Sequence, residues 1–91
     1  MTSIVADIGG TNARFAYLEP GKPGLQGIEI FPSANFAYFV EAVQAYLDKV
    51  ALDKVARACL AVAGPVEGDW IDLPNNHWAF SCDELRDALG M

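Results

Sequence analysis

The stretch that decides the fold is Ile4-Val5-Ala6-Asp7-Ile8-Gly9-Gly10-Thr11-Asn12-Ala13-Arg14-Phe15-Ala16, residues 4–16 of the chain. An apolar run reaches Asp7, two glycines follow, and apolar residues then resume with strand spacing, which predicts a strand, a tight turn and a second strand. Consecutive N–H groups that no Cβ shields can hold an anion, such as the phosphate tail of a nucleotide. Asp7 could hold a hydrated metal ion against the same phosphates. A plain two-residue hairpin explains the glycine pair equally well.

Two other glycine motifs are excluded by their spacing. A phosphate loop needs Gly-x-x-x-x-Gly-Lys followed by Ser or Thr, and a dinucleotide site needs Gly-x-Gly-x-x-Gly at the start of a helix. Neither pattern occurs, and the residues after Gly10 alternate as in a strand.

Three blocks of the sequence carry a resemblance to a known family. Residues 7–14 resemble the first phosphate motif of bacterial ATP-dependent glucokinases, which belong to the sugar kinase, Hsp70 and actin superfamily. Residues 64–70 and 75–81 resemble the same family in the same order. The resemblance covers essentially the whole chain, but only the first part of such an enzyme.

The resemblance implies an α/β fold with a ribonuclease-H-like (actin-like ATPase) mixed sheet and helices. Residues 1–91 would form the incomplete N-terminal part of the small domain, with the remainder of the enzyme absent. It also implies phosphoryl transfer from ATP, bound with Mg²⁺, to D-glucose, giving glucose 6-phosphate. For the intact enzyme, a homodimer is one open possibility.

The resemblance also assigns roles to residues. The positions that match the nucleotide site are Ala6, Asp7, Ile8, Gly9, Gly10, Thr11, Asn12 and Arg14, with Asp7 holding the metal through water. Gly64, Pro65 and Asn75 are candidates for contacts with the sugar, although a strand-ending turn and a turn-forming asparagine explain them as well. The family's catalytic base is the aspartate of a later Asn-Asp-Phe segment, which this sequence lacks, so these 91 residues alone are expected to be inactive.

Two alternatives stay open. Another sugar kinase of the superfamily, acting on an amino sugar or serving as a transcriptional regulator, would share the first hairpin, although the sequence lacks the zinc-binding cluster of some such relatives. A non-catalytic binding or dimerisation module would keep the fold without the chemistry.

Composition and charge restrict the partners. The chain of 91 residues is 53% apolar and 20% charged, which favours a globular domain. Six basic and twelve acidic residues give a net charge of −6, which disfavours nucleic acids and anionic membranes as partners. The sequence shows no signal peptide, and its longest apolar run, residues 58–66, is too short to span a bilayer, so we expect a cytoplasmic protein.

The remaining pattern predicts further elements. We expect strands at 3–8, 13–18 and 26–31, the last at an edge, and a helix from an Asn35 N-cap to about Ala51. A continuously apolar strand at 58–63 should be central, buried on both faces and parallel to the first strand. A short strand at 69–73 and a helix that starts after Ser81 and ends at Gly90 complete the prediction.

Several side chains receive a structural interpretation. Cys59, in the predicted buried strand, and Cys82, at a helix start, are expected to be reduced thiols without a catalytic role. His77 is expected to be a surface residue. Trp70, Trp78 and Phe80 are expected to bury their rings and hold their loop on the body of the domain, although stacking on a sugar stays open as an alternative.

Overall fold

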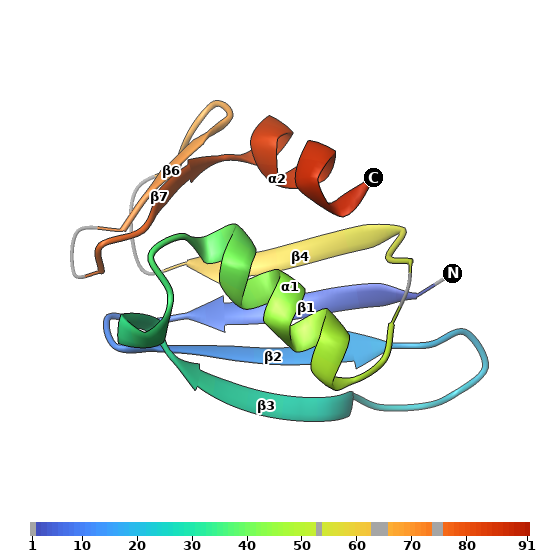
Figure 1. Ribbon diagram of the computed structural model, residues 1–91. Coiled ribbons are helices and arrows are strands. Elements are labelled where there is room, and N and C mark those ends of the chain that lie inside the picture. The colour runs from blue at the N-terminus through green and yellow to red at the C-terminus, as the bar shows by residue number, and fades with distance from the viewer. Residues whose placement is uncertain (1, 53, 63–65, 74–75) are drawn as a thin grey trace.

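The computed structural model describes residues 2–52, 54–62, 66–73 and 76–91. Four strands form a mixed sheet: β1 (Ser3–Ile8), β2 (Asn12–Leu18), β3 (Gln26–Pro32) and β4 (Arg57–Val62). Their order is β3-β2-β1-β4, with β4 parallel to β1 and the other neighbours antiparallel (Figure 1). The predicted hairpin, the edge position of β3 and the parallel pairing of the fourth strand with the first are confirmed.

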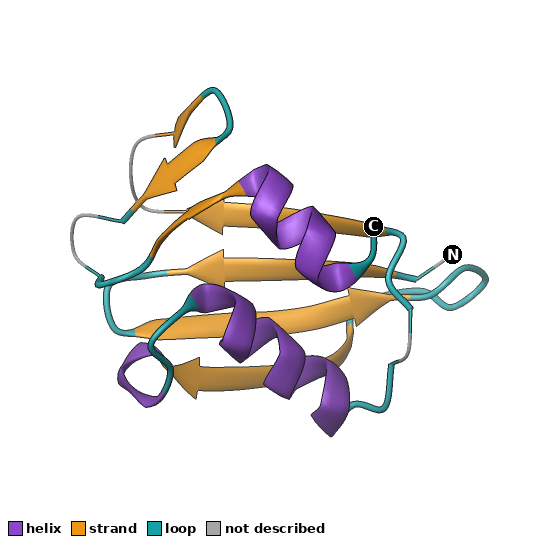
Figure 2. Cartoon of the chain, turned by 45° about the horizontal axis from the view of Figure 1, so that its top comes forward, coloured by secondary structure: helices purple, strands orange, loops and turns teal. Residues whose placement is uncertain are grey.

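Two helices, α1 (Phe39–Lys49) and α2 (Cys82–Leu89), lie on the same face of this sheet (Figure 2). Alternate residues of β1 point toward them, because Ile4 and Ile8 are fully buried while Asp7 is exposed. Phe15 of β2 stacks on two rings of α1, with centroid distances of 6.0 Å to Phe39 and 5.0 Å to Tyr46. The core therefore lies between one sheet face and the helices.

The helix begins later than the sequence predicted. Asn35 is not its N-cap, because Ser33–Asn35 forms a short 3-10 turn and both Phe36 and Tyr38 have extended backbones. The carbonyl of Phe36 accepts hydrogen bonds from the rings of His77 and Trp78 instead of entering a helix. The Glu41 carboxylate accepts a hydrogen bond of 3.0 Å from the Tyr38 N–H, and α1 starts there.

The prediction that residues 58–63 form a central strand buried on both faces is wrong. Strand β4 is at the edge of the four-stranded sheet, and its exposed residues alternate with half-buried ones. Ala58, Leu60 and Val62 pack against the core, whereas Cys59 is exposed on the opposite face. No element in the described part of the chain covers that face, so Cys59 is not the buried residue that the apolar run suggested.

A second, three-stranded antiparallel sheet contains β5 (Val66–Glu67), β6 (Trp70–Asp72) and β7 (Ala79–Ser81). The sequence predicted the strand that contains β6, but it did not predict a strand at β7. Trp78 and Phe80 are buried as expected, and Phe80 stacks on Phe39 at 4.7 Å. The expectation for Trp70 is wrong, because this residue is 47% exposed.

Strand β7 leads directly into α2, whose ends follow the predicted signals. The Ser81 hydroxyl accepts a 3.0 Å hydrogen bond from the Glu84 N–H, and Gly90 ends the helix with a left-handed backbone (φ 70°). Strands β6 and β7 lie toward the same end of the molecule as the β1–β2 turn (Figure 1).

Candidate functional site

The β1–β2 turn is a two-residue loop that its own backbone closes. The N–H of Gly9 donates to the carbonyl of Asn12 at 3.0 Å, with Gly10 and Thr11 between them. Gly9 does not adopt a left-handed backbone, and a Cβ built on it would lie 3.8 Å from its nearest neighbour, the carbonyl oxygen of Asn12. The fold therefore leaves open space beside Gly9 and does not itself require a glycine there.

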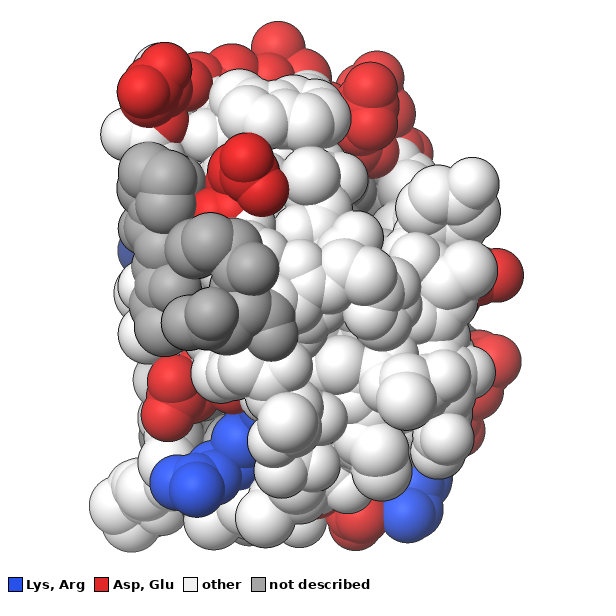
Figure 3. Space-filling model, turned by 90° about the vertical axis from the view of Figure 1, so that its left-hand side faces the viewer, with Lys and Arg blue, Asp and Glu red and all other residues white. Residues whose placement is uncertain are grey.

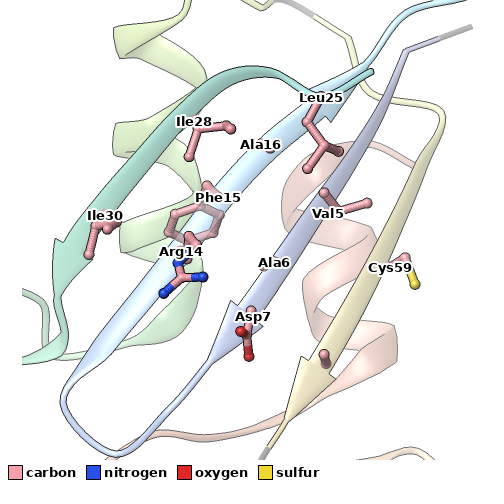
Figure 4. A pocket seen from close by; sticks show the side chains of 11 residues that line it. Val5, Ala6, Asp7, Arg14, Phe15, Ala16, Leu25, Ile28, Ile30 and Cys59 are labelled. Atoms are coloured by element: carbon pink, nitrogen blue, oxygen red, sulfur yellow. The ribbon is translucent and has the colours of Figure 1, made fainter. Parts of the chain in front are cut away.

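Asp7 and Arg14 face each other across the two strands of this hairpin. They are register partners, both are exposed, and their side chains lie on the same face of the sheet (Figure 4). Among the described residues, no ion pair joins them. A carboxylate and a guanidinium are thus both available to a ligand beside the turn.

One small cavity unites the candidate nucleotide-binding residues. It measures about 220 Å³, and its lining consists of Asp7, Gly9, Gly10, Thr11, Asn12, Arg14 and Ile30. Six of the eight residues expected at the nucleotide site therefore surround one opening. Ala6 and Ile8 are buried, with Ile8 fully so, and their side chains do not line this cavity.

The N–H groups at the tip of the turn remain unused by the rest of the described chain. Within the described residues, neither the N–H of Gly10 nor that of Thr11 donates a hydrogen bond. These donors, with Arg14, suit an anionic group, and the exposed carboxylate of Asp7 suits a hydrated cation. The donor set therefore fits a nucleotide phosphate chain with a divalent metal ion.

The predicted sugar contacts cannot be placed in the same way. Gly64, Pro65 and Asn75 all lie outside the described residues. Their assignment stays a prediction.

Two residues of the turn's surroundings were missed by the sequence analysis. The N–H of Ser33 donates to the Thr11 carbonyl at 2.9 Å, and the side-chain amide of Asn76 donates to the Gly9 carbonyl at 3.2 Å. Both residues are remote from the turn in sequence, so no local spacing could have revealed them.

His77 is a surface residue, as the sequence predicted, and it also makes a contact that the sequence did not predict. Its ring is exposed, and Nε2 lies 2.7 Å from the Phe36 carbonyl, which the Nε1–H of Trp78 also reaches at 3.0 Å. Because a carbonyl only accepts, Nε2 carries the proton in this contact. Within the ranges that the structure describes, no group of three His, Cys, Asp or Glu side chains is arranged to hold a metal ion.

The surface charge around the turn is not strongly positive. Seen from that end of the molecule, Lys and Arg side chains are few and do not form a continuous patch (Figure 3). If a phosphate binds at this turn, the attraction for it would come from the local N–H groups and Arg14, since the net charge of −6 opposes it.

A larger cavity, of about 610 Å³, lies on the uncovered face of the sheet (Figure 4). Apolar side chains such as Val5, Ile28 and Ile30 line most of it, while Asp7 and Arg14 mark the end nearest the turn.

Neither helix of the described chain is long enough and apolar enough to cross a membrane.

Comparison with known proteins gives consistent matches. The family model for glucokinase matches residues 4–91. A glucokinase of Campylobacter jejuni subsp. doylei is 46% identical over 88 residues, which are 97% of this chain and 26% of that protein. A glucokinase of Marinobacter nauticus is 42% identical over 88 residues, covering 97% of this chain and 27% of that protein.

A solved structure shows the same fold. The crystal structure of a glucokinase from an Antarctic psychrotroph matches with a TM-score of 0.88 and 40% identity, over 98% of this chain and 29% of that chain. The chain thus spans about a quarter of the length of the curated relatives that it matches.

Proposed function

This chain belongs to the glucokinase family, and on that basis we propose that residues 1–91 form the N-terminal part of the small α/β domain of a longer glucokinase. The resemblance carried by the three sequence blocks is confirmed by the family match, and the α/β fold by a related glucokinase structure. The complete enzyme would transfer the γ-phosphoryl group of ATP to the 6-hydroxyl of D-glucose. ADP, glucose 6-phosphate and a proton are the products.

One observation supports the nucleotide role of this segment above all others. Asp7, Arg14 and the open N–H groups of the Gly9–Thr11 turn converge on one small cavity. A hairpin with a purely structural role would not require a carboxylate, a guanidinium and unpaired N–H groups to lie around one opening.

Each group has a distinct task in the proposal. The N–H groups of Gly10 and Thr11 would donate to phosphate oxygens, and Arg14 would balance part of their charge. A Mg²⁺ ion bound with ATP would supply further charge neutralisation to the phosphates. Asp7 would orient this ion by accepting hydrogen bonds from its water ligands.

The catalytic base lies outside this proposal for residues 1–91. The resemblance assigns that role to an aspartate in an Asn-Asp-Phe segment, and these residues contain none. We propose that the segment positions the phosphates, while later parts of the enzyme bind glucose and accept its proton, with Gly64, Pro65 and Asn75 adding contacts to the sugar.

A kinetic assay of the complete enzyme tests the proposal. Purified protein is supplied with MgATP and D-glucose or an amino sugar, and ADP and sugar phosphate are measured together. We expect stoichiometric ADP and glucose 6-phosphate, with D-glucose preferred. A folded protein that turns over an amino sugar but not glucose, or no sugar at all, would overturn the assignment.

Two further points belong to the same proposal. We place the enzyme in the cytoplasm, where its substrates ATP and glucose would be available, and allow a homodimer as its assembled state. Cell fractionation tests the location, and light scattering of the complete enzyme tests its assembly.

A further inference from the structure

Asn76 joins the phosphate turn to a distant part of the chain. It lies 67 positions after Gly9, yet its side-chain Nδ2 donates to the Gly9 carbonyl at 3.2 Å. The same nitrogen donates to the Ser33 hydroxyl at 2.8 Å, and Oδ1 accepts from the Trp78 N–H at 3.1 Å. Both N–H groups and the oxygen of this amide are therefore engaged, which determines its orientation.

Ser33 is the buried hydrogen-bond partner of this amide. It is 3% exposed, and each of its polar groups has a partner. Its hydroxyl accepts from Asn76, its N–H donates to the Thr11 carbonyl at 2.9 Å, and its carbonyl accepts from the Phe36 N–H at 3.2 Å. A buried serine whose N–H, carbonyl and hydroxyl oxygen each have a hydrogen-bond partner is firmly placed, so it can hold both Asn76 and the turn.

The bond from Asn76 also determines where the next N–H points. The described chain contains no cis peptide, and in a trans peptide the carbonyl of one residue and the N–H of the next point in opposite directions. Because the Gly9 carbonyl is directed at Asn76, the Gly10 N–H is directed away from it. The small cavity is lined by Gly9, Gly10 and Thr11 but by neither Asn76 nor Ser33, so these two side chains hold the turn from outside the cavity.

We propose that Asn76, hydrogen-bonded to the buried Ser33, is a positioning residue for the nucleotide phosphates. It holds the Gly9–Gly10 peptide in the orientation that presents the Gly10 N–H to a phosphate oxygen. Asn76 itself does not touch the nucleotide, and the inference rests on the proposed function of the turn. Preorganised donors contribute more to binding than donors that must first be oriented.

The test is a KM comparison in the complete enzyme. Asn76→Ala removes both donors, and we expect the KM for MgATP to rise about tenfold, since that is the effect of one lost hydrogen bond of ordinary net strength. The KM for glucose should change little. A purely structural role would instead lower the melting temperature and the active fraction while leaving the KM for MgATP unchanged.

Matched variants separate these outcomes. Asn35→Ala removes an exposed asparagine from the same 3-10 turn as Ser33 and should leave both KM values unchanged. If Asn76→Ala does not fold, Asn76→Asp keeps the side-chain shape and removes the donors, with Asn35→Asp as its control. In a double variant with Gly9→Ala, the combined loss should be smaller than the product of the two single losses, because both act on one peptide.

The possible failures are distinguishable. If the wild-type enzyme has no measurable affinity for MgATP, the proposed function is overturned. If the wild type binds MgATP and folded Asn76 variants bind it equally well, only the role of Asn76 is overturned.

Discussion

Gly9 is a position at which the fold has room for a side chain. Its backbone is not left-handed, and a Cβ would meet nothing closer than 3.8 Å. Gly27 is the opposite case, since its φ is 56° and a Cβ would lie 2.6 Å from Cε1 of Tyr17. The fold therefore requires a glycine at position 27 but not at position 9, where the proposed nucleotide site would be the reason for it.

Gly9→Ala should change binding without changing stability. We expect the free energy of unfolding to stay within about 0.5 kcal/mol of the wild type, as for substitutions that disturb no contact. The KM for MgATP should rise about tenfold, because the methyl group would enter the space beside the amides that we propose to bind phosphate. Thermal unfolding and steady-state kinetics of the complete enzyme measure both quantities.

Gly27→Ala serves as the contrasting variant. It should lower the free energy of unfolding by about 1–3 kcal/mol, through backbone strain and overlap with Tyr17. A Gly9→Ala enzyme that is as destabilised as Gly27→Ala, or that keeps the wild-type KM for MgATP, would refute the distinction.

At the scale of elements, a buried tyrosine connects α1 to β3. The Tyr46 hydroxyl donates to the Gly27 carbonyl at 2.7 Å, and the residue has no exposed surface. Burial raises the pKa of Tyr46 from 10.0 to about 12. An unfolded tyrosine ionises near its ordinary pKa of 10, so the folded state should lose stability as the pH rises from about 10 to 12.

Tyr46→Phe tests this connection. At pH 7 the variant should lose about 1 kcal/mol of unfolding free energy, because the Gly27 carbonyl loses its donor. It should also lose the part of the alkaline destabilisation that comes from Tyr46. Denaturant unfolding at several pH values measures this, with Tyr38→Phe, at a residue that is 68% exposed, as the control. Equal pH profiles for Tyr46→Phe and wild type would contradict the account.

The strands and helices differ in how far the sequence predicted them. Strands β1, β2 and β3 follow from alternation, and α2 follows from Ser81 and Gly90, because these signals act locally. The predicted start of α1 was wrong because the Phe36 carbonyl accepts hydrogen bonds from His77 and Trp78, which lie 41 and 42 positions further along the chain. Such tertiary contacts override local helix spacing.

The candidate site divides along the same line. Residues 7–14 form one hairpin, so their grouping around one cavity could be predicted from adjacency in the chain. The contacts of Ser33 and Asn76 with the turn could not be predicted, since both residues are remote from the turn in sequence and only the tertiary fold brings them to it. Which face of β4 stays exposed also depends on the whole fold. For this reason the sequence wrongly predicted that Cys59 would be buried.

At the scale of the whole molecule, one face of the sheet is uncovered and apolar. Leu25, Ile28 and Ile30 are each more than half exposed there, beside the cavity of about 610 Å³. Contiguous exposed apolar surface of this kind promotes association. We therefore expect the 91-residue polypeptide, prepared by itself, to self-associate.

A double variant, Ile28→Lys with Ile30→Lys, should reduce this association. Lysine on an edge strand opposes pairing between chains, and both residues belong to the edge strand β3. Sedimentation of the two polypeptides over a range of concentrations gives their masses. Gln44→Lys on the exposed side of α1 should leave the association unchanged. A wild-type polypeptide that stays monomeric throughout would contradict this prediction.

The whole account depends on the Gly9–Thr11 turn and Asp7 meeting a nucleotide phosphate chain with its metal ion. The most direct measurement is the affinity of the complete enzyme for ATP, with and without Mg²⁺, in the wild type, in Asp7→Asn and in the control Asp48→Asn. We expect Mg²⁺ to strengthen ATP binding in the wild type and the control, and this gain to fall by about tenfold or more in Asp7→Asn, with glucose affinity nearly unchanged. An Asp7→Asn enzyme that retains the full effect of Mg²⁺ on ATP binding would contradict the account.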